Sequence, residues 1–118
     1  MASSNAARLG ETFELLEHPY RRYVLYYLRT HSGGVDIETL AAMLANELDG
    51  PSVTGGRETA GQIEIALHHR HLPHLADAGL ITFTQDEQSV ELEGMNGHGP
   101  FVEEAARIDG YANPDANE

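Results

Sequence analysis

Residues 63–93 constrain the fold of this chain more than any other stretch of its sequence. Their first half carries apolar residues three to five positions apart, a spacing that buries one helix face, at Ile63, Leu67, Leu72 and Leu75. Gly79 follows, and a glycine readily takes the left-handed conformation in which helices end. The sequence therefore predicts a helix over about 59–78. Pro73 lies inside it and lacks a backbone N–H, which predicts a kink or a break.

The residues after this helix change to the pattern of a β-hairpin. Leu80, Ile81 and Phe83 enter a strand, Val90 and Leu92 alternate with polar residues on the return strand, and the polar turn 85–88 joins the two. A helix that leads directly into a hairpin forms the second half of a winged helix-turn-helix. We therefore expect a mainly α fold with a small β-hairpin wing (α+β), the wing spanning 82–92.

The upstream sequence supplies the other helices of such a domain. A first apolar face ends before Pro19 and consists of Leu9, Phe13 and Leu16. We expect a second helix over 20–31 and a third over 37–48, the third being capped by Asp36. Val35, just before it, should form a one-residue strand that pairs with the wing. We expect the inward face of the second helix to be made by Tyr20, Val24, Leu25, Tyr27 and Leu28. The side exposed to solvent should carry Arg21, Arg22 and Arg29.

The chain of 118 residues is near the usual size of one domain. We expect a disordered N-terminus (1–8), a winged-helix domain (9–93), a hinge with a short C-terminal helix (94–108) and a disordered tail (109–118). The C-terminal helix would carry one apolar side, made by Phe101, Ala105 and Ile108. Residues 49–58 are a loop by composition, and this loop is long for the turn of a helix-turn-helix.

The charge balance is strongly acidic. There are 19 acidic residues against seven basic ones, all arginine, and the net charge is −12. This lysine-free composition is typical of a halophile that accumulates salt, where carboxylates keep proteins soluble. At about 1 M salt the Debye length is roughly 3 Å, so the charge does not exclude DNA binding there. No apolar run reaches the length of a membrane span and no signal-peptide core is present, so we expect a cytoplasmic protein.

Three segments resemble the ArsR-like winged-helix repressors. They are the run HRHL at 69–72 followed by GLI at 79–81, the run HPYRRYVLYYL at 18–28, and IETLA at 37–41. The chain is also similar, over roughly 11–93, to an uncharacterised haloarchaeal winged-helix family. This resemblance implies a transcriptional regulator that binds double-stranded DNA. It also implies a homodimer whose contacts come from the helices at 11–31 and 100–108.

Candidate DNA-binding residues follow from placing helix 59–78 in the major groove. The side facing away from the buried residues carries Gln62, His69 and Arg70, of which Arg70 suits guanine or phosphate and Gln62 suits adenine. Arg57 near the helix N-terminus could hold a phosphate. On the wing, the polar residues that could reach the minor groove or backbone are Thr84, Gln85 and Gln88. Each of these residues could instead be ordinary solvated surface.

The sequence also bears on three other classes of function: metal binding, catalysis and protein binding. Imidazole and carboxylate groups three or four positions apart on a helix could share a metal ion, at Glu64, His68, His71 and His74, but Pro73 disturbs that geometry. The sequence carries no cysteine and no phosphate-cradling glycine loop, and its serines have no acid–base pair nearby. We therefore expect neither an enzyme nor a cofactor. The remaining alternative is a winged helix that binds another protein and not DNA, which the acidic charge favours.

Overall fold

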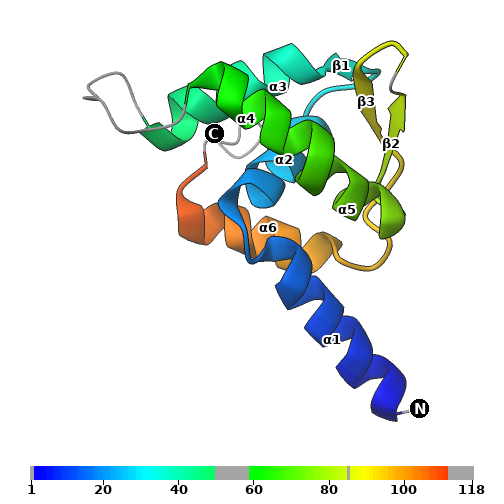
Figure 1. Cartoon of the computed structure of the whole chain (residues 1–118). Helices are drawn as coiled ribbons and strands as arrows, with labels where there is room; N and C mark the ends of the chain where they lie inside the picture. Colours follow the sequence, from blue (N-terminus) through cyan, green and yellow to red (C-terminus); the bar gives the residue numbers. More distant parts are fainter. Residues whose placement is uncertain (1, 50–58, 85, 112–118) are drawn as a thin grey trace.

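The computed structural model describes residues 2–49, 59–84 and 86–111 (Figure 1). In chain order, the elements are α1 (Ala2–Leu16), α2 (Pro19–Arg29), β1 (Val35–Asp36), α3 (Ile37–Leu44), the π-helical turn η1 (Ala45–Asp49), α4 (Ala60–Ala66), the π-helical turn η2 (Leu67–His71), α5 (Leu72–Asp77), β2 (Ile81–Thr84), β3 (Ser89–Leu92) and α6 (Gly99–Asp109). The fold is mainly α with a small antiparallel sheet, so the predicted winged-helix class is confirmed. Within the described ranges, no helix combines the length and hydropathy needed to cross a membrane.

The sheet has the order β1-β3-β2, with both pairs antiparallel. Val90 is the central residue, since it pairs with Val35 on one side and with Phe83 on the other. The expected pairing of Val35 with the wing is therefore confirmed, although the strand includes Asp36 as well. Gly34 makes a close approach possible here, because a Cβ at this position would meet the side-chain oxygen of Ser89.

The core forms where α2, α3, α4, η2 and α5 meet the sheet. Its largest fully buried side chains are Leu15, Leu25, Tyr26, Leu28, Ile37, Leu40, Leu44, Ile63, Leu67, Leu72, Leu75 and Leu80. Pro19 stands in the first turn of α2, as expected, and His18 caps that helix through its ring nitrogen. Asp36 occupies the N-cap of α3, but its side chain makes no capping hydrogen bond.

The prediction for the faces of α2 was partly wrong. Arg21 was expected in solvent but is buried, and Tyr20 and Tyr27 are only half-buried while Tyr23 and Tyr26 take the inner positions. The reason is the end of α1, whose free carbonyls need donors. Arg21 donates from Nε to the Leu15 carbonyl at 2.9 Å, and this hydrogen bond offsets part of the free-energy cost of burying the guanidinium.

The terminal helices also differ from expectation. Residues 2–8 form the first part of α1, which extends away from the body of the molecule (Figure 1). The inner side of α1 is made by Thr12 and Leu15, whereas Leu9 and Phe13 are 41% and 63% exposed. Helix α6 buries Val102 and Ala106, so the apolar side with Phe101 and Ile108 faces solvent. Large apolar side chains therefore remain exposed to solvent on both terminal helices.

The helix predicted over 59–78 runs through Pro73 by means of a π turn. The N–H of Leu72 donates to the carbonyl of Leu67, five residues back, and the backbone stays helical at both residues. Pro73 then stands in the first turn of α5, where its missing N–H matters little. The helix is therefore neither broken nor purely α. It ends as predicted at Gly79, whose φ is +81°.

Candidate nucleic-acid interface

Helix α4 packs on α3 with one face and leaves the opposite face open. Ile63 and Leu67 are buried. The residues that look away from them are exposed, and they are Gly61, Gln62, Ile65, His69 and Arg70. The sequence therefore predicted the outward side of Gln62, His69 and Arg70 correctly.

Gln62 caps the N-terminus of α4, a role that was not predicted from the sequence. Its side-chain oxygen accepts a hydrogen bond from the backbone N–H of Thr59 at 2.9 Å, and the Thr59 hydroxyl accepts from the N–H of Gln62 at 3.2 Å. This reciprocal pair is a capping box, for which the spacing Thr-x-x-Gln was the available signal. The side-chain oxygen of Gln62 is thus engaged in starting the helix, which weakens its assignment as an adenine reader.

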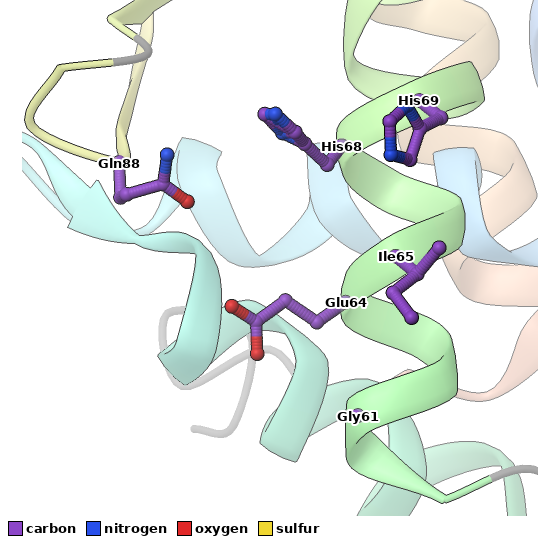
Figure 2. A pocket seen from close by; sticks show the side chains of 6 residues that line it. All are labelled: Gly61, Glu64, Ile65, His68, His69 and Gln88. Carbon is purple, nitrogen blue, oxygen red and sulfur yellow. The ribbon is translucent and has the colours of Figure 1, made fainter.

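A hollow of about 300 Å³ lies between helix α4–η2 and the wing turn. Six residues line it: Gly61, Glu64, Ile65, His68, His69 and Gln88. Figure 2 shows Glu64 and His68 on the side of the helix nearer Gln88, while Ile65 and His69 project from a different side. The hollow is open and combines one aliphatic side chain with carboxylate, imidazole and amide groups.

His68 holds the helix against the wing. Its ring meets Phe83 of β2 edge to face at a centroid distance of 5.4 Å, and it meets His69 in the same manner at 5.0 Å. Its Nδ1 is buried and has no hydrogen-bond partner among the described residues. The contact with Phe83 joins α4–η2 to β2, the strand that leads into the wing turn. It therefore fixes the two sides of the hollow relative to each other.

The wing turn is fixed at its base and acidic at its tip. Ile37 donates its backbone N–H to the carbonyl of Gln88 at 3.0 Å, and Gln88 has a positive φ of +52°. Thr84 and Gln88 are exposed, as a contact role requires, and so are Asp86 and Glu87 beside them. Two further candidates, Arg57 and Gln85, lie outside the described residues.

The rear of the helix is anchored by a buried polar contact. Nη1 of Arg21 lies 3.0 Å from Nδ1 of His71, and both side chains are buried. Burial lowers the pKa of His71 to about 3, and the positively charged groups around the ring, His18 first among them, act in the same direction. The imidazole is therefore neutral near pH 7. No sequence signal indicated this pairing, because the two residues are far apart in the chain.

The four residues considered for a metal ion do not converge. His71 points inward to Arg21, whereas Glu64 and His68 line the outer hollow. In the part of the chain that the structure describes, no group of three or more histidine, aspartate or glutamate residues could hold a metal ion. The geometry thus gives no support to the alternative of a site made by Glu64, His68, His71 and His74.

The residues missing from the sequence-based list are Ile65 and Glu64. Ile65 is two positions, or about 200°, from the buried Ile63 on a helix, so helical geometry alone places it outward. Its apolar character, however, suggested a core residue. Glu64 was considered only as a metal ligand, yet its place in the hollow puts a carboxylate beside any ligand that enters there.

Comparison with known proteins yields one match. A family model described as "Domain of unknown function (DUF7344)" matches residues 13–91, which include every element from α2 to β2 and all of β3 except Leu92. No curated protein and no solved structure matches the chain.

Proposed function

The chain belongs to the DUF7344 family of domains of unknown function, and we propose that it is a DNA-binding transcriptional regulator that acts as a homodimer. The recognition helix would be α4–η2–α5, lying in the major groove, with the β2–β3 wing beside it. The observation that carries this proposal is the open face of α4–η2. Donor side chains of His69 and Arg70 stand there in solvent, next to an exposed wing turn, on the side of the helix opposite the core.

Electrostatics decide how such binding would work. Most non-specific affinity for DNA comes from neutralising phosphates, and a chain with a net charge of −12 supplies little of it. Asp86 and Glu87 at the wing tip would repel the backbone further at low salt. We therefore expect affinity to depend on base contacts and on Arg70, and to be greatest where salt screens the acidic surface.

The proposed dimer would use the uncovered apolar sides of α1 and α6. Outside α4, the exposed large apolar residues in the described part of the chain are Leu9 and Phe13 on α1 and Phe101 and Ile108 on α6. Helix α1 is joined to α6 through Thr12 and His98, whose side chains form a buried hydrogen bond of 2.6 Å. These two helices could therefore present their apolar residues as one fixed unit to a second copy.

The test is equilibrium binding by fluorescence anisotropy, at low salt and at about 2 M KCl, to random-sequence DNA and to the promoter of its own gene. We expect saturable, sequence-dependent binding that Arg70→Glu abolishes. Arg107→Glu is the matched control for the charge change, and its mass is checked by light scattering, because Arg107 lies on the exposed side of α6 that is proposed for the dimer. Absence of binding to any DNA at every salt concentration at which the protein stays folded would contradict the proposal.

A second candidate function is binding to another protein through the same surface. The specific observation in its favour is the pair Asp86 and Glu87, which makes the wing tip suited to a basic partner and unsuited to phosphate. The DNA experiment separates the two functions. A protein-binding module would ignore DNA in both salt regimes, and its partner contact would depend on Asp86 and Glu87 more than on Arg70.

A further inference from the structure

Ile65 is an aliphatic side chain in an unexpected place. It is 62% exposed, lies on α4 on the side away from the buried Ile63, and lines the hollow beside the wing. A single exposed isoleucine needs no special explanation on an ordinary surface. This one lines the same open hollow as Glu64, His69 and Gln88, and it projects with His69 from the side of the helix away from Gln88 (Figure 2). It belongs to the surface proposed to meet DNA.

Gly61, one helical turn before Ile65, supports an external contact at this point. A glycine in a helix costs roughly 0.5–1 kcal/mol relative to alanine. Here a Cβ would meet only the Thr59 side-chain oxygen, at 3.8 Å, so the described fold gives no steric reason for glycine. Open space beside Ile65 would instead allow another molecule to approach the helix backbone closely.

Duplex DNA offers one apolar group in its major groove, the 5-methyl group of thymine. We propose that Ile65 reads this methyl group, and that Gly61 provides the clearance for the base pair that carries it. The proposal rests on the DNA-binding function argued above and adds a base preference to it. Each site bound by one protomer would then contain a T·A pair whose methyl group packs on Ile65.

Such a contact suits an acidic protein. Phosphate contacts weaken with added salt because they release counterions, whereas burying a methyl group against an isoleucine does not depend on charge. A chain with net charge −12 would therefore retain this part of its specificity in the salt concentrations that screen its own repulsion. Loss of one buried methyl group corresponds to about fourfold in affinity.

The experiment begins with selection of the preferred site from random-sequence duplexes. Each thymine of that site is then replaced singly by deoxyuridine, which keeps base pairing and removes only the methyl group. At one position in each half-site, deoxyuridine is expected to weaken binding of the native protein by about fourfold. Ile65→Ala should lose about as much on the thymine site and show no further loss with deoxyuridine at that position.

Ile65→Val is the matched control, because it keeps an aliphatic contact and should retain most of the discrimination. All three proteins should have the same unfolding transition, since Ile65 is largely exposed. If deoxyuridine has no effect at any position, or the same effect on native protein and Ile65→Ala, the methyl-reading proposal is wrong while DNA binding stands. If selection enriches no sequence and no DNA binds, both proposals fall.

Discussion

Nη1 of Arg21 lies 3.0 Å from Nδ1 of His71, in a contact that joins α2 to the π turn η2. A guanidinium can only donate, so Nδ1 accepts and the ring proton resides on Nε2. The same guanidinium donates from Nε to the Leu15 carbonyl and from Nη2 to the Glu14 carbonyl, both at 2.9 Å. One buried cation thus connects the end of α1, the start of α2 and the helix that would meet DNA.

The first prediction concerns pH. The pKa of His71 is about 3 in the folded protein, against an ordinary value of 6.5, so the unfolded chain binds the extra proton first. Stability from this group is fully present above about pH 6.5 and is lost as the pH falls toward 3. Within that window the free energy of unfolding should decrease by up to about 1.4 kcal/mol per pH unit. Urea denaturation at constant ionic strength over pH 4–7.5 measures it.

His71→Asn provides the comparison for that experiment. An asparagine side-chain oxygen can accept from Arg21 near the position of Nδ1 but does not titrate. The difference in stability between native and variant proteins should therefore shrink as the pH falls, even though carboxylates contribute to both curves. A difference that stays constant from pH 7.5 to 4 would show that His71 does not titrate across the folding equilibrium.

The second prediction concerns the attachment of α6. Asp109 accepts from Nε of Arg22 at 2.8 Å and from the hydroxyl of Tyr26 at 2.6 Å. These bonds hold the pKa of the Asp109 carboxyl below its ordinary value, and burial together with the hydrogen bond to Asp109 raises the pKa of Tyr26. Asp109→Ala should lower the free energy of unfolding by about 2–3 kcal/mol, because it leaves partly buried donors without their acceptor.

Glu104→Ala is its control by chemical denaturation. Glu104 pairs with Arg107 on the same helix, but both side chains are well exposed, so Glu104→Ala should leave the free energy of unfolding nearly unchanged. Amide hydrogen exchange should also show faster exchange in α6 for the Asp109 variant alone. Equal losses for both variants would contradict the role of Asp109 as the anchor of α6.

The third prediction concerns the end of the recognition helix. Gly79 has φ of +81°, and Gly79→Ala should therefore cost about 1–2 kcal/mol in the free energy of unfolding. Gly61→Ala is the matched change inside α4, where a Cβ is accommodated, and it should stabilise the fold by up to about 1 kcal/mol. Thermal melting of the two variants checks both signs, and a stabilising Gly79→Ala would refute the account of the helix end.

The fourth prediction concerns the proposed dimer. Phe13 is 63% exposed on α1, so Phe13→Glu should leave folding intact and convert a dimer to a monomer, as measured by light scattering after gel filtration. Ile65→Glu places the same charge on a similarly exposed apolar residue of α4, and it should leave the mass unchanged. A monomeric native protein, or a dimer that both variants leave intact, would contradict α1 and α6 as the interface.

Sequence patterns predicted the parts of this fold that depend on local order. Regular spacing marked the helix from Ile63 onward, and Gly79 marked its end, because each signal is confined to neighbouring residues. The burial of Arg21 could not be predicted in this way, since it depends on carbonyls presented by another helix. The π turn was equally hidden, because Pro73 indicated an interruption without indicating which hydrogen-bond pattern would absorb it.

The candidate site shows the same division. The outward direction of His69 and Arg70 followed from helical spacing. The role of Gln62 in the capping box was readable but missed, and Ile65 was missed because an apolar residue is expected inside. The anchoring of His71 needed the tertiary structure, as it brings together residues 50 positions apart. DNA binding itself remains a prediction.

The π turn at Leu67–His71 has a consequence for how relatives of this protein diverge. A π turn contains one residue more than an α turn needs, so its loss would rotate α4 by about 100° relative to α5 and the wing. Gly61 and Ile65 would then point in a different direction relative to the wing, although neither residue had changed. Single-residue gaps at this point of the family would therefore mark members with different targets, even where the outward residues are identical.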